Sequence, residues 1–361
     1  MKLVLSILII LLGTILMAEE NLKWIDAHEL GVSGKENYKT FNRFSDADYQ
    51  KILDAKMENV QWLALNTAGM HIDFTTDASE IYIQFELLDP NVMYHMASTG
   101  SAGFDMYIKQ KNKWRYYSTA NFDYKKPVNT CPMFLRKEAV LLNDQKELTF
   151  SLNFPLYNGL KSLKIGVNPE ATIKPITYWD EKPIIIYGSS ITQGGCASRP
   201  GMAYTNILRR EIDRDVYNLG FSGSGLLEHT ITDILCQKDP EIMVMDCVSN
   251  MRQLDEETFI ERFNYFYDNF RKAHPTTPIL FMEKPTFPGA WAKDVNIPKN
   301  DLLSKLYKKW KKNDKNIYYI KSKDLYGKDL EAAVDGVHAT DLGFYRMSIP
   351  VNKTVKKILG L

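Results

Sequence analysis

The chain has few cysteines, almost no net charge and no internal repeat. Its 361 residues include only four cysteines, none in a Cys-x-x-Cys pair, so the sequence carries no signal of a structural zinc site. With 45 basic and 44 acidic side chains the formal net charge is +1, which gives no electrostatic basis for binding nucleic acid. Hydrophobic residues make up 45% of the chain, which excludes wholesale disorder.

Long apolar runs are also missing, with one exception at the N-terminus. Leu3–Met17 is almost uninterrupted in its hydrophobicity, but a membrane-spanning helix needs about 20 such residues. A lysine before the run and Ala18 after it predict a signal peptide over residues 1–18, cleaved after Ala18. Leu16 at the −3 position fits the small-residue cleavage rule poorly, so an uncleaved N-terminal anchor is the alternative.

Cleavage there would place the mature protein in the periplasm or outside the cell, with no stable insertion into a membrane. The absence of a cysteine near the cleavage site argues against a lipoprotein. Removing the leader removes one lysine and no acid, so the formal net charge falls from +1 to 0. An exported protein can form disulfides. We consider one pairing, Cys196 with Cys247, because both residues are expected near the rim of the candidate active site described below.

Two different patterns divide the mature chain near Pro175–Pro183. From residue 19 to 177, short aromatic and β-branched segments between Asp, Asn, Pro and Gly turns predict a β-sandwich. From residue 182 to 361, apolar strands alternate with amphipathic helices, which predicts a parallel sheet with helices on both faces and its site at the carboxyl ends of the strands. The expected strands of this second part are Ile184–Tyr187, Val216–Leu219, Ile242–Cys247, Ile279–Met282 and Ile317–Ile320, and the expected helices are Met202–Ile212, Leu226–Cys236, Asp255–Ala273 and Asp301–Lys312.

Two segments of the second part supply the groups of a serine hydrolase. Ile184–Gly194 is an apolar strand that runs into Gly-Ser-Ser and a helix start, which would expose Ser190 on a tight turn. Near the other end, Asp335 and His338 stand three residues apart, so His338 can take the serine proton while Asp335 orients the imidazole. Each segment alone is more often an ordinary turn or surface cap, and their joint presence is what favours a catalytic reading.

Two further segments offer donors for an oxyanion at the same predicted edge. Asn218–Gly225 is rich in glycine, which lets backbone N–H groups approach a developing negative charge. Met243–Asn250 is an apolar strand that ends in a carboxamide, and the NH₂ group of Asn250 can donate to the same oxygen. An ordinary turn residue is the alternative interpretation of Asn250.

In order and in residue type, these four segments resemble the four blocks of the SGNH (GDSL-like) hydrolases. The family's Gly-Asp-Ser stands here as Gly188-Ser189-Ser190, so the resemblance assigns the nucleophile to Ser190 and marks Ser189 as a departure. It assigns an oxyanion hole to the Ser190 and Gly223 N–H groups and the Asn250 side chain, and the acid and base to Asp335 and His338.

A fifth segment, Gly103–Tyr107, resembles the Gly-x-Asp-Leu-Tyr signature of a β-domain that precedes such hydrolases in secreted bacterial proteins. Met106 stands where that signature has leucine, which conserves volume. The resemblance therefore implies a three-layer, flavodoxin-like hydrolase domain over residues 182–361 behind a jelly-roll-like β-sandwich over residues 19–177.

The family organisation implies a secreted carbohydrate O-acetylesterase that acts on an acetylated poly- or oligosaccharide and needs no metal or organic cofactor. A short-chain esterase or thioesterase on small or lipid-like substrates is the alternative, and a glycan-binding protein with a disused hydrolase site is another. The loop Thr286–Pro298 has only two aromatic side chains, Phe287 and Trp291, unlike the long apolar lid of a lipase.

Arg199 follows the candidate nucleophile closely and is expected either to bind a substrate carboxylate or sugar hydroxyl or to form an interdomain ion pair. Asp246 is expected to have a buried structural role. The other histidines show no catalytic spacing and are expected to be structural; they are His28, His71, His95, His229 and His274.

Overall fold

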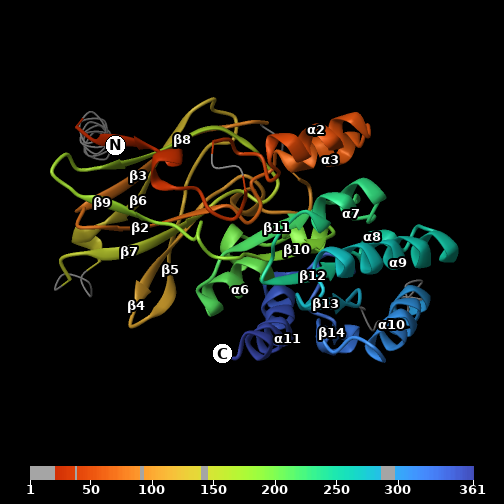
Figure 1. The fold of residues 1–361 in the computed structure, drawn as a ribbon. Coiled ribbons are helices and arrows are strands. Elements are labelled where there is room, and N and C mark those ends of the chain that lie inside the picture. The colour runs from red at the N-terminus through yellow and green to blue at the C-terminus, as the bar shows by residue number, and fades with distance from the viewer. Residues whose placement is uncertain (1–20, 37–38, 90–92, 140–144, 286–296) are drawn as a thin grey trace.

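The computed structural model describes residues 21–36, 39–89, 93–139, 145–285 and 297–361. The predicted signal peptide lies outside these ranges, as does most of the loop Thr286–Pro298. Figure 1 shows the N-terminal strands gathered on one side and the parallel sheet with its helices on the other. Across the described ranges, no helix combines the length and the apolarity needed to cross a membrane.

The N-terminal part is a β-sandwich of two antiparallel sheets that share one core. One sheet has the strand order β1 (Lys23–Asp26), β8 (Leu160–Val167), β3 (Glu80–Leu87), β6 (Asn129–Leu135). The other has the order β5 (Lys113–Thr119), β4 (Asp105–Gln110), β7 (Leu148–Asn153), β2 (His71–Thr76), β9 (Ile173–Ile176). The predicted sandwich is confirmed.

Alternation along the strands builds this core. In β3, Ile81, Ile83 and Phe85 are buried in the core, whereas Gln84 and Glu86 are only half-buried. The opposite sheet contributes aromatic and aliphatic side chains to the same cluster, among them Phe74, Met106, Ile108, Phe150 and Leu152.

The C-terminal part contains a parallel sheet of five strands in the order β11 (Val216–Gly220), β10 (Ile184–Gly188), β12 (Ile242–Asp246), β13 (Ile279–Met282), β14 (Ile317–Ile320). Numbered along this domain the order is 2-1-3-4-5, the flavodoxin-like arrangement, so the predicted fold class is confirmed. All five strands match the predicted segments to within one residue at their ends.

Helices cover both faces of this sheet, because successive side chains of each strand point to opposite sides. Ile184 and Ile186 of β10 pack with α6 (Tyr204–Ile212) and α11 (Asp341–Leu359), whereas Ile185 and Tyr187 pack with the other layer. That second layer consists of α7 (His229–Cys236), α9 (Glu256–Ala273) and α10 (Ile297–Lys311). Three further α-helices are short and lie in connecting segments: α4 (Ser98–Ser101), α5 (Ser190–Gln193) and α8 (Val248–Met251).

Two helices depart from the predicted division of the chain. α2 (Asp46–Asp54) and α3 (Glu58–Ala64) belong to the N-terminal segment, but Ile52 and Leu63 lie in the core cluster of the α/β domain. Figure 1 places both helices above α7. The N-terminal segment therefore supplies a β-sandwich together with a helical cover for its neighbour.

Candidate active site

Three neighbouring strands bring the predicted blocks to one edge of the sheet. Gly188, the last residue of β10, is paired in register with Gly220 of β11 on one side and with Asp246 of β12 on the other. The carboxyl ends of all three strands lie at the same edge of the sheet, because the strands are parallel and end in register. The segments that carry Ser190, Gly223 and Asn250 therefore start side by side.

The turn that carries Ser190 is held by hydrogen bonds at its base. Ser189 caps α5, since its hydroxyl accepts from Ile191 N–H (3.2 Å) and its own N–H donates to the Thr192 hydroxyl (3.1 Å). Gly188 permits the close approach, because a Cβ there would lie 1.9 Å from Thr192 Oγ1. Ser190 is thus the first residue of the helix and is 5% exposed.

A continuous chain of hydrogen bonds joins Ser190 to two side chains near the C-terminus. Ser190 Oγ lies 2.9 Å from His338 Nε2, and His338 Nδ1 lies 2.7 Å from Asp335 Oδ2. The other oxygen of Asp335 accepts from the His338 N–H at 2.8 Å and from the Val337 N–H at 3.0 Å. Because an ionised carboxylate can only accept, it fixes the proton on Nδ1 and leaves the Nε2 lone pair for the serine hydroxyl.

Asp335 is arranged to stay ionised. Its partial burial by itself would raise its pKa, but the hydrogen bonds from the His338 N–H, the His338 ring and the Val337 N–H outweigh that effect and lower the pKa below its usual value. A charged Asp335 is the state that orients His338 and stabilises an imidazolium.

The two other predicted donors lie in the segments that follow the neighbouring strands β11 and β12. Gly223 has φ +71°, and a Cβ built on it would meet nothing within 4 Å, so its backbone faces open space. The Asn250 Oδ1 atom accepts from the Gly225 N–H at 3.0 Å. That bond holds the amide of Asn250 in place and directs its carbonyl oxygen, rather than its NH₂ group, to the backbone.

Asp246 supports the serine turn from beneath, in the buried role that the sequence suggested. Its Oδ2 accepts from the Thr192 hydroxyl at 2.8 Å and from the Tyr204 hydroxyl at 2.7 Å. Burial raises the pKa of Asp246 to about 6, although these two hydrogen bonds hold it down. Asp246 therefore ties Thr192, the third residue of α5, to the sheet.

Two further supports of the turn were not predicted. The Tyr157 hydroxyl, from the β-domain, donates to the Ser190 carbonyl at 3.0 Å. Gln193 Oε1 accepts from the Ser222 N–H at 3.0 Å, which connects the serine turn to the loop that carries Gly223. No local spacing signals either contact, because each joins segments that are distant in sequence or lie on different strands.

Comparison with known proteins was made against family models, curated proteins and solved structures. The model of the GDSL-like lipase/acylhydrolase family matches residues 181–356, and the model of the N-terminus of SGNH-hydrolase-type esterases matches residues 22–173. A crystal structure of a GDSL-like lipase from Bacteroides ovatus has 31% sequence identity and a TM-score of 0.83, covering 94% of this chain and 98% of its own. The chain belongs to the GDSL-like, or SGNH, hydrolase family. It is therefore an ester hydrolase by family.

Other solved structures share the fold at low identity. A salicylyl-acyltransferase from a tetracycline biosynthetic pathway has 14% identity and a TM-score of 0.68, covering 94% of this chain and 97% of its own. A family two carbohydrate esterase from Cellvibrio japonicus has 13% identity and a TM-score of 0.59, with 94% and 98% covered. The search of curated proteins found no match.

Arg199 lies at the junction of the SGNH domain and the β-domain. Its Nη1 is 2.6 Å from Asp105 Oδ2 and 2.6 Å from the Tyr107 hydroxyl. Asp105 and Tyr107 carry the polar side chains of the Gly103–Tyr107 signature, and both contact Arg199. This signature therefore contributes to the interface between the two domains. Of the two roles expected for Arg199, the ion pair is the one observed.

The Cys196–Cys247 pairing is wrong, since these two cysteines form no disulfide with each other. Cys247 is buried in the hydrophobic cluster on the α9 side of the sheet, whereas Cys196 lies at the active-site rim. Each cysteine is close to a catalytic segment in the sequence, but the two thiols lie in different surroundings in the structure.

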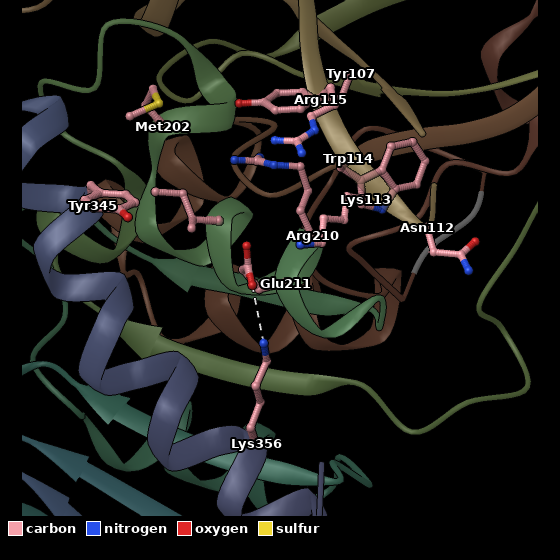
Figure 2. A pocket seen from close by; sticks show the side chains of 11 residues that line it. Tyr107, Asn112, Lys113, Trp114, Arg115, Met202, Arg210, Glu211, Tyr345 and Lys356 are labelled. Carbon is pink, nitrogen blue, oxygen red and sulfur yellow. Dashed lines mark hydrogen bonds and ion pairs between the residues drawn. The ribbon is translucent and has the colours of Figure 1, made fainter. Parts of the chain in front are cut away.

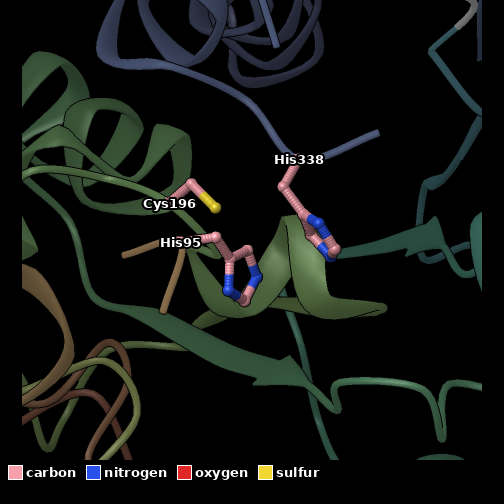
Figure 3. Close-up of side chains that lie close together, drawn as sticks. All are labelled: His95, Cys196 and His338. Atoms are coloured by element: carbon pink, nitrogen blue, oxygen red, sulfur yellow. The ribbon is translucent and has the colours of Figure 1, made fainter. Parts of the chain in front are cut away.

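His95 departs from the purely structural role that was expected of it. Its ring lies in an edge-on contact with that of His338, with 5.4 Å between centroids. One ring nitrogen of each histidine also lies within 4.8 Å of the Cys196 sulfur (Figure 3). His95 belongs to the segment before α4, so the β-domain contributes a side chain to the edge of the active site.

A separate cavity of about 570 Å³ lies at the domain junction between β5, α6 and α11 (Figure 2). Aromatic and basic side chains line it, among them Tyr107, Trp114, Arg115, Arg210 and Tyr345. None of Ser190, His338 or Asp335 lines this cavity. The hydrogen-bonded chain, rather than the cavity, therefore defines the candidate active site.

Proposed function

We propose that this protein is an exported carbohydrate O-acetylesterase that works through a Ser190–His338–Asp335 acyl-enzyme mechanism. The observation that carries the proposal is the 2.9 Å and 2.7 Å hydrogen-bonded chain from the serine through the imidazole to the carboxylate. It gives a nucleophile, a base and an orienting acid in one line at the carboxyl edge of a parallel sheet.

In the acylation step, Ser190 Oγ attacks the ester carbonyl while His338 Nε2 takes its proton. The negative charge that develops on the carbonyl oxygen is stabilised by the Ser190 and Gly223 N–H groups and by the Asn250 NH₂ group. His338 then gives the proton to the leaving alcohol as the tetrahedral intermediate collapses to the acyl-enzyme.

In the deacylation step, the same groups act on water. His338 takes a proton from the attacking water, the acyl–oxygen bond to Ser190 breaks, and the proton returns to Ser190 Oγ. Acetate leaves and the enzyme is regenerated. Asp335 favours the imidazolium in both steps, and no redox change takes place, so the step needs no further co-reactant.

A carbohydrate alcohol is favoured by an aromatic side chain at the site. Tyr94 is 95% exposed, and its ring lies 4.4 Å from that of His95, which in turn contacts His338. A fully exposed aromatic ring that is separated from the catalytic base by one side chain offers a flat platform for stacking on a sugar ring. The carbohydrate esterases that share this fold, one of them from Clostridium thermocellum in complex with cellohexaose, support the same substrate class.

The first test is acetate release from acetylated xylan and from a small aryl acetate. The protein from residue 19 onward is compared with its Ser190→Ala and Ser189→Ala variants. Ser190→Ala should abolish release from both substrates, whereas Ser189→Ala should keep most of the rate, because Ser189 only caps a helix at a cost of about 1 kcal/mol. Equal activity of the Ser190→Ala variant would refute the serine mechanism.

The same experiment separates the substrate classes. Release from both substrates supports a polysaccharide deacetylase, and activity on the aryl ester alone assigns the protein to small esters. A rate that rises from acetyl to butyryl favours the short-chain acyl esterase instead. Tyr94→Ala should raise KM for the polysaccharide and leave KM for the aryl acetate unchanged. N-terminal sequencing of the secreted protein tests export and cleavage after Ala18.

A further inference from the structure

Three metal-binding side chains converge beside the serine. They are His95, Cys196 and His338, and their nearest donor atoms all lie within 4.8 Å of one another (Figure 3). They come from three segments: the chain before α4, the turn after α5 and the loop before α11. Over the ranges that the structure describes, this is the one group of three His, Cys or carboxylate residues so arranged.

Two of these three side chains have no part in the hydrolysis described above. His95 Nδ1 is buried and makes no hydrogen bond. Such a buried polar atom without a partner is uncommon and calls for a ligand or a counterpart. The Cys196 thiol is buried as well, at a residue held at φ +75°.

The donor set suits a borderline or soft cation such as Zn²⁺ and not a hard one. Two imidazole nitrogens and one sulfur are ligands that Zn²⁺ prefers, whereas Mg²⁺ and Ca²⁺ require oxygen donors. Tetrahedral zinc with bonds of about 2.0–2.3 Å needs neighbouring donors roughly 3.5 Å apart. The donor atoms now lie within 4.8 Å of one another, so zinc binding requires them to move closer by at most about 1.3 Å.

His338 is already prepared as such a ligand. Asp335 accepts from its Nδ1–H at 2.7 Å, which leaves the lone pair on Nε2, the arrangement commonly found behind a zinc-bound imidazole. That lone pair is the one that now faces Ser190 Oγ at 2.9 Å. A metal at Nε2 and the serine hydroxyl therefore compete for the same pair of electrons.

We propose that His95, Cys196 and His338 form a Zn²⁺ site and that zinc inhibits the enzyme reversibly by capturing the catalytic base. Binding forms two Zn–N bonds and one Zn–S bond, and the thiol proton of Cys196 goes to solvent, so the affinity rises with pH. The fourth position remains for water. The binding is independent of the proposed function, whereas its inhibitory effect rests on the serine mechanism.

Zinc binding is measured first, without catalysis. The wild-type protein and the Ser190→Ala variant are titrated with ZnCl₂ against a chromophoric chelator. Both should bind one Zn²⁺ per chain, and Cys196→Ser and His95→Gln should each weaken binding at least about tenfold. Cys236→Ser and His229→Gln are matched controls, because both residues lie outside the cluster, and these variants should bind zinc as the wild type does. Absence of 1:1 binding, or equal affinity in Cys196→Ser and Cys236→Ser, would overturn the proposal.

Inhibition is measured next on the aryl acetate, each variant relative to its own rate in chelator-treated buffer. Zinc should suppress the wild-type rate at least about tenfold and excess EDTA should restore it, with Mg²⁺ having no effect. Cys196→Ser and His95→Gln should need at least about tenfold more zinc for the same suppression. Zinc that binds without inhibiting would show that His338 is not a ligand. A protein that binds zinc as expected but hydrolyses no ester would refute the proposed function and leave the site standing.

Discussion

Arg199 of the SGNH domain and Asp105 of the β-domain form an ion pair with 2.6 Å between Nη1 and Oδ2. The Asp105 side chain is fully buried and that of Arg199 is 20% exposed. The same carboxylate accepts from the Gly201 N–H at 2.9 Å and from Asn153 Nδ2 at 2.9 Å. The buried carboxylate of Asp105 thus accepts from three donors that belong to two domains, and these contacts hold the two domains together.

Loss of both partners should destabilise the protein no more than loss of one of them. Arg199→Gln and Asp105→Asn should each lower the free energy of unfolding by about 2–4 kcal/mol, because each leaves a charged or polar partner buried without its counterpart. The double variant should cost no more than the larger single one. Urea unfolding of all four proteins measures this coupling.

Additive costs in that cycle would contradict a direct pair. If Arg199 bound substrate instead, Arg199→Gln would raise KM for the polysaccharide while the unfolding midpoint stayed at the wild-type value. KM and the midpoint measured on the same preparation distinguish the two roles.

Asn250 should contribute to the transition state and little to substrate binding. Asn250→Ala should lower kcat by about 10²–10³ with a small change in KM, because one oxyanion donor is lost. Asn250→Asp keeps an acceptor for the Gly225 N–H but has no NH₂ group, so it should be at least as slow. Steady-state kinetics on the aryl acetate measures both, and a fast Asn250→Asp variant would show that the amide acts only through the loop.

Two glycines on the same segment should respond very differently to a methyl group. A Cβ at Gly220 would lie 2.2 Å from the backbone nitrogen of Gln193, so Gly220→Ala must displace the serine turn. A Cβ at Gly223 would meet nothing within 4 Å, and only its φ of +71° opposes the change, at about 1 kcal/mol.

Gly223→Ala should accordingly fold and keep its activity within about tenfold, since its N–H remains. Gly220→Ala should lose most activity and unfold at a lower temperature. Thermal unfolding and kcat of the two variants test this contrast, and a well-folded, active Gly220→Ala would disprove the packing argument.

The parts of the site that were predicted share one property: each is carried by a short local motif. Gly188-Ser189-Ser190 follows an apolar strand, and Asp335 and His338 are three residues apart, so strand ends and spacing sufficed to find them. The parallel sheet was equally predictable, because most residues of its strands are apolar and the strands alternate with amphipathic helices.

The parts that were missed depend on packing between distant segments. His95 reaches His338 from another domain, and nothing in the sequence around His95 reports that neighbour. Cys247 follows a strand whose alternating side chains face opposite layers, and a one-residue difference decides which layer a thiol enters. Helix α2 has three aspartates among its nine residues and buries Asp48 together with Ile52, so its apolar pattern is weak.

Asp246 should make the free energy of unfolding depend on pH between about 4 and 6. Its pKa is raised to about 6 by burial, against about 3.9 in an unfolded chain, so the folded state holds the proton more firmly between these values. The contribution of this group to stability is therefore fully present below pH ~4, falls as pH rises to ~6, and stays at the lower level above that. The two-unit difference corresponds to about 2–3 kcal/mol.

Asp246→Asn removes the titration and keeps an oxygen that can accept from Thr192 and Tyr204. The difference in unfolding free energy between wild type and variant should therefore shift by about 2–3 kcal/mol in favour of the variant between pH 4 and 6, and be constant from pH 7 to 8. Urea unfolding at half-unit pH steps measures it. Parallel curves from pH 4 to 8 would show that Asp246 is ionised in the folded protein throughout, and that the Thr192 and Tyr204 hydroxyls fully compensate its burial.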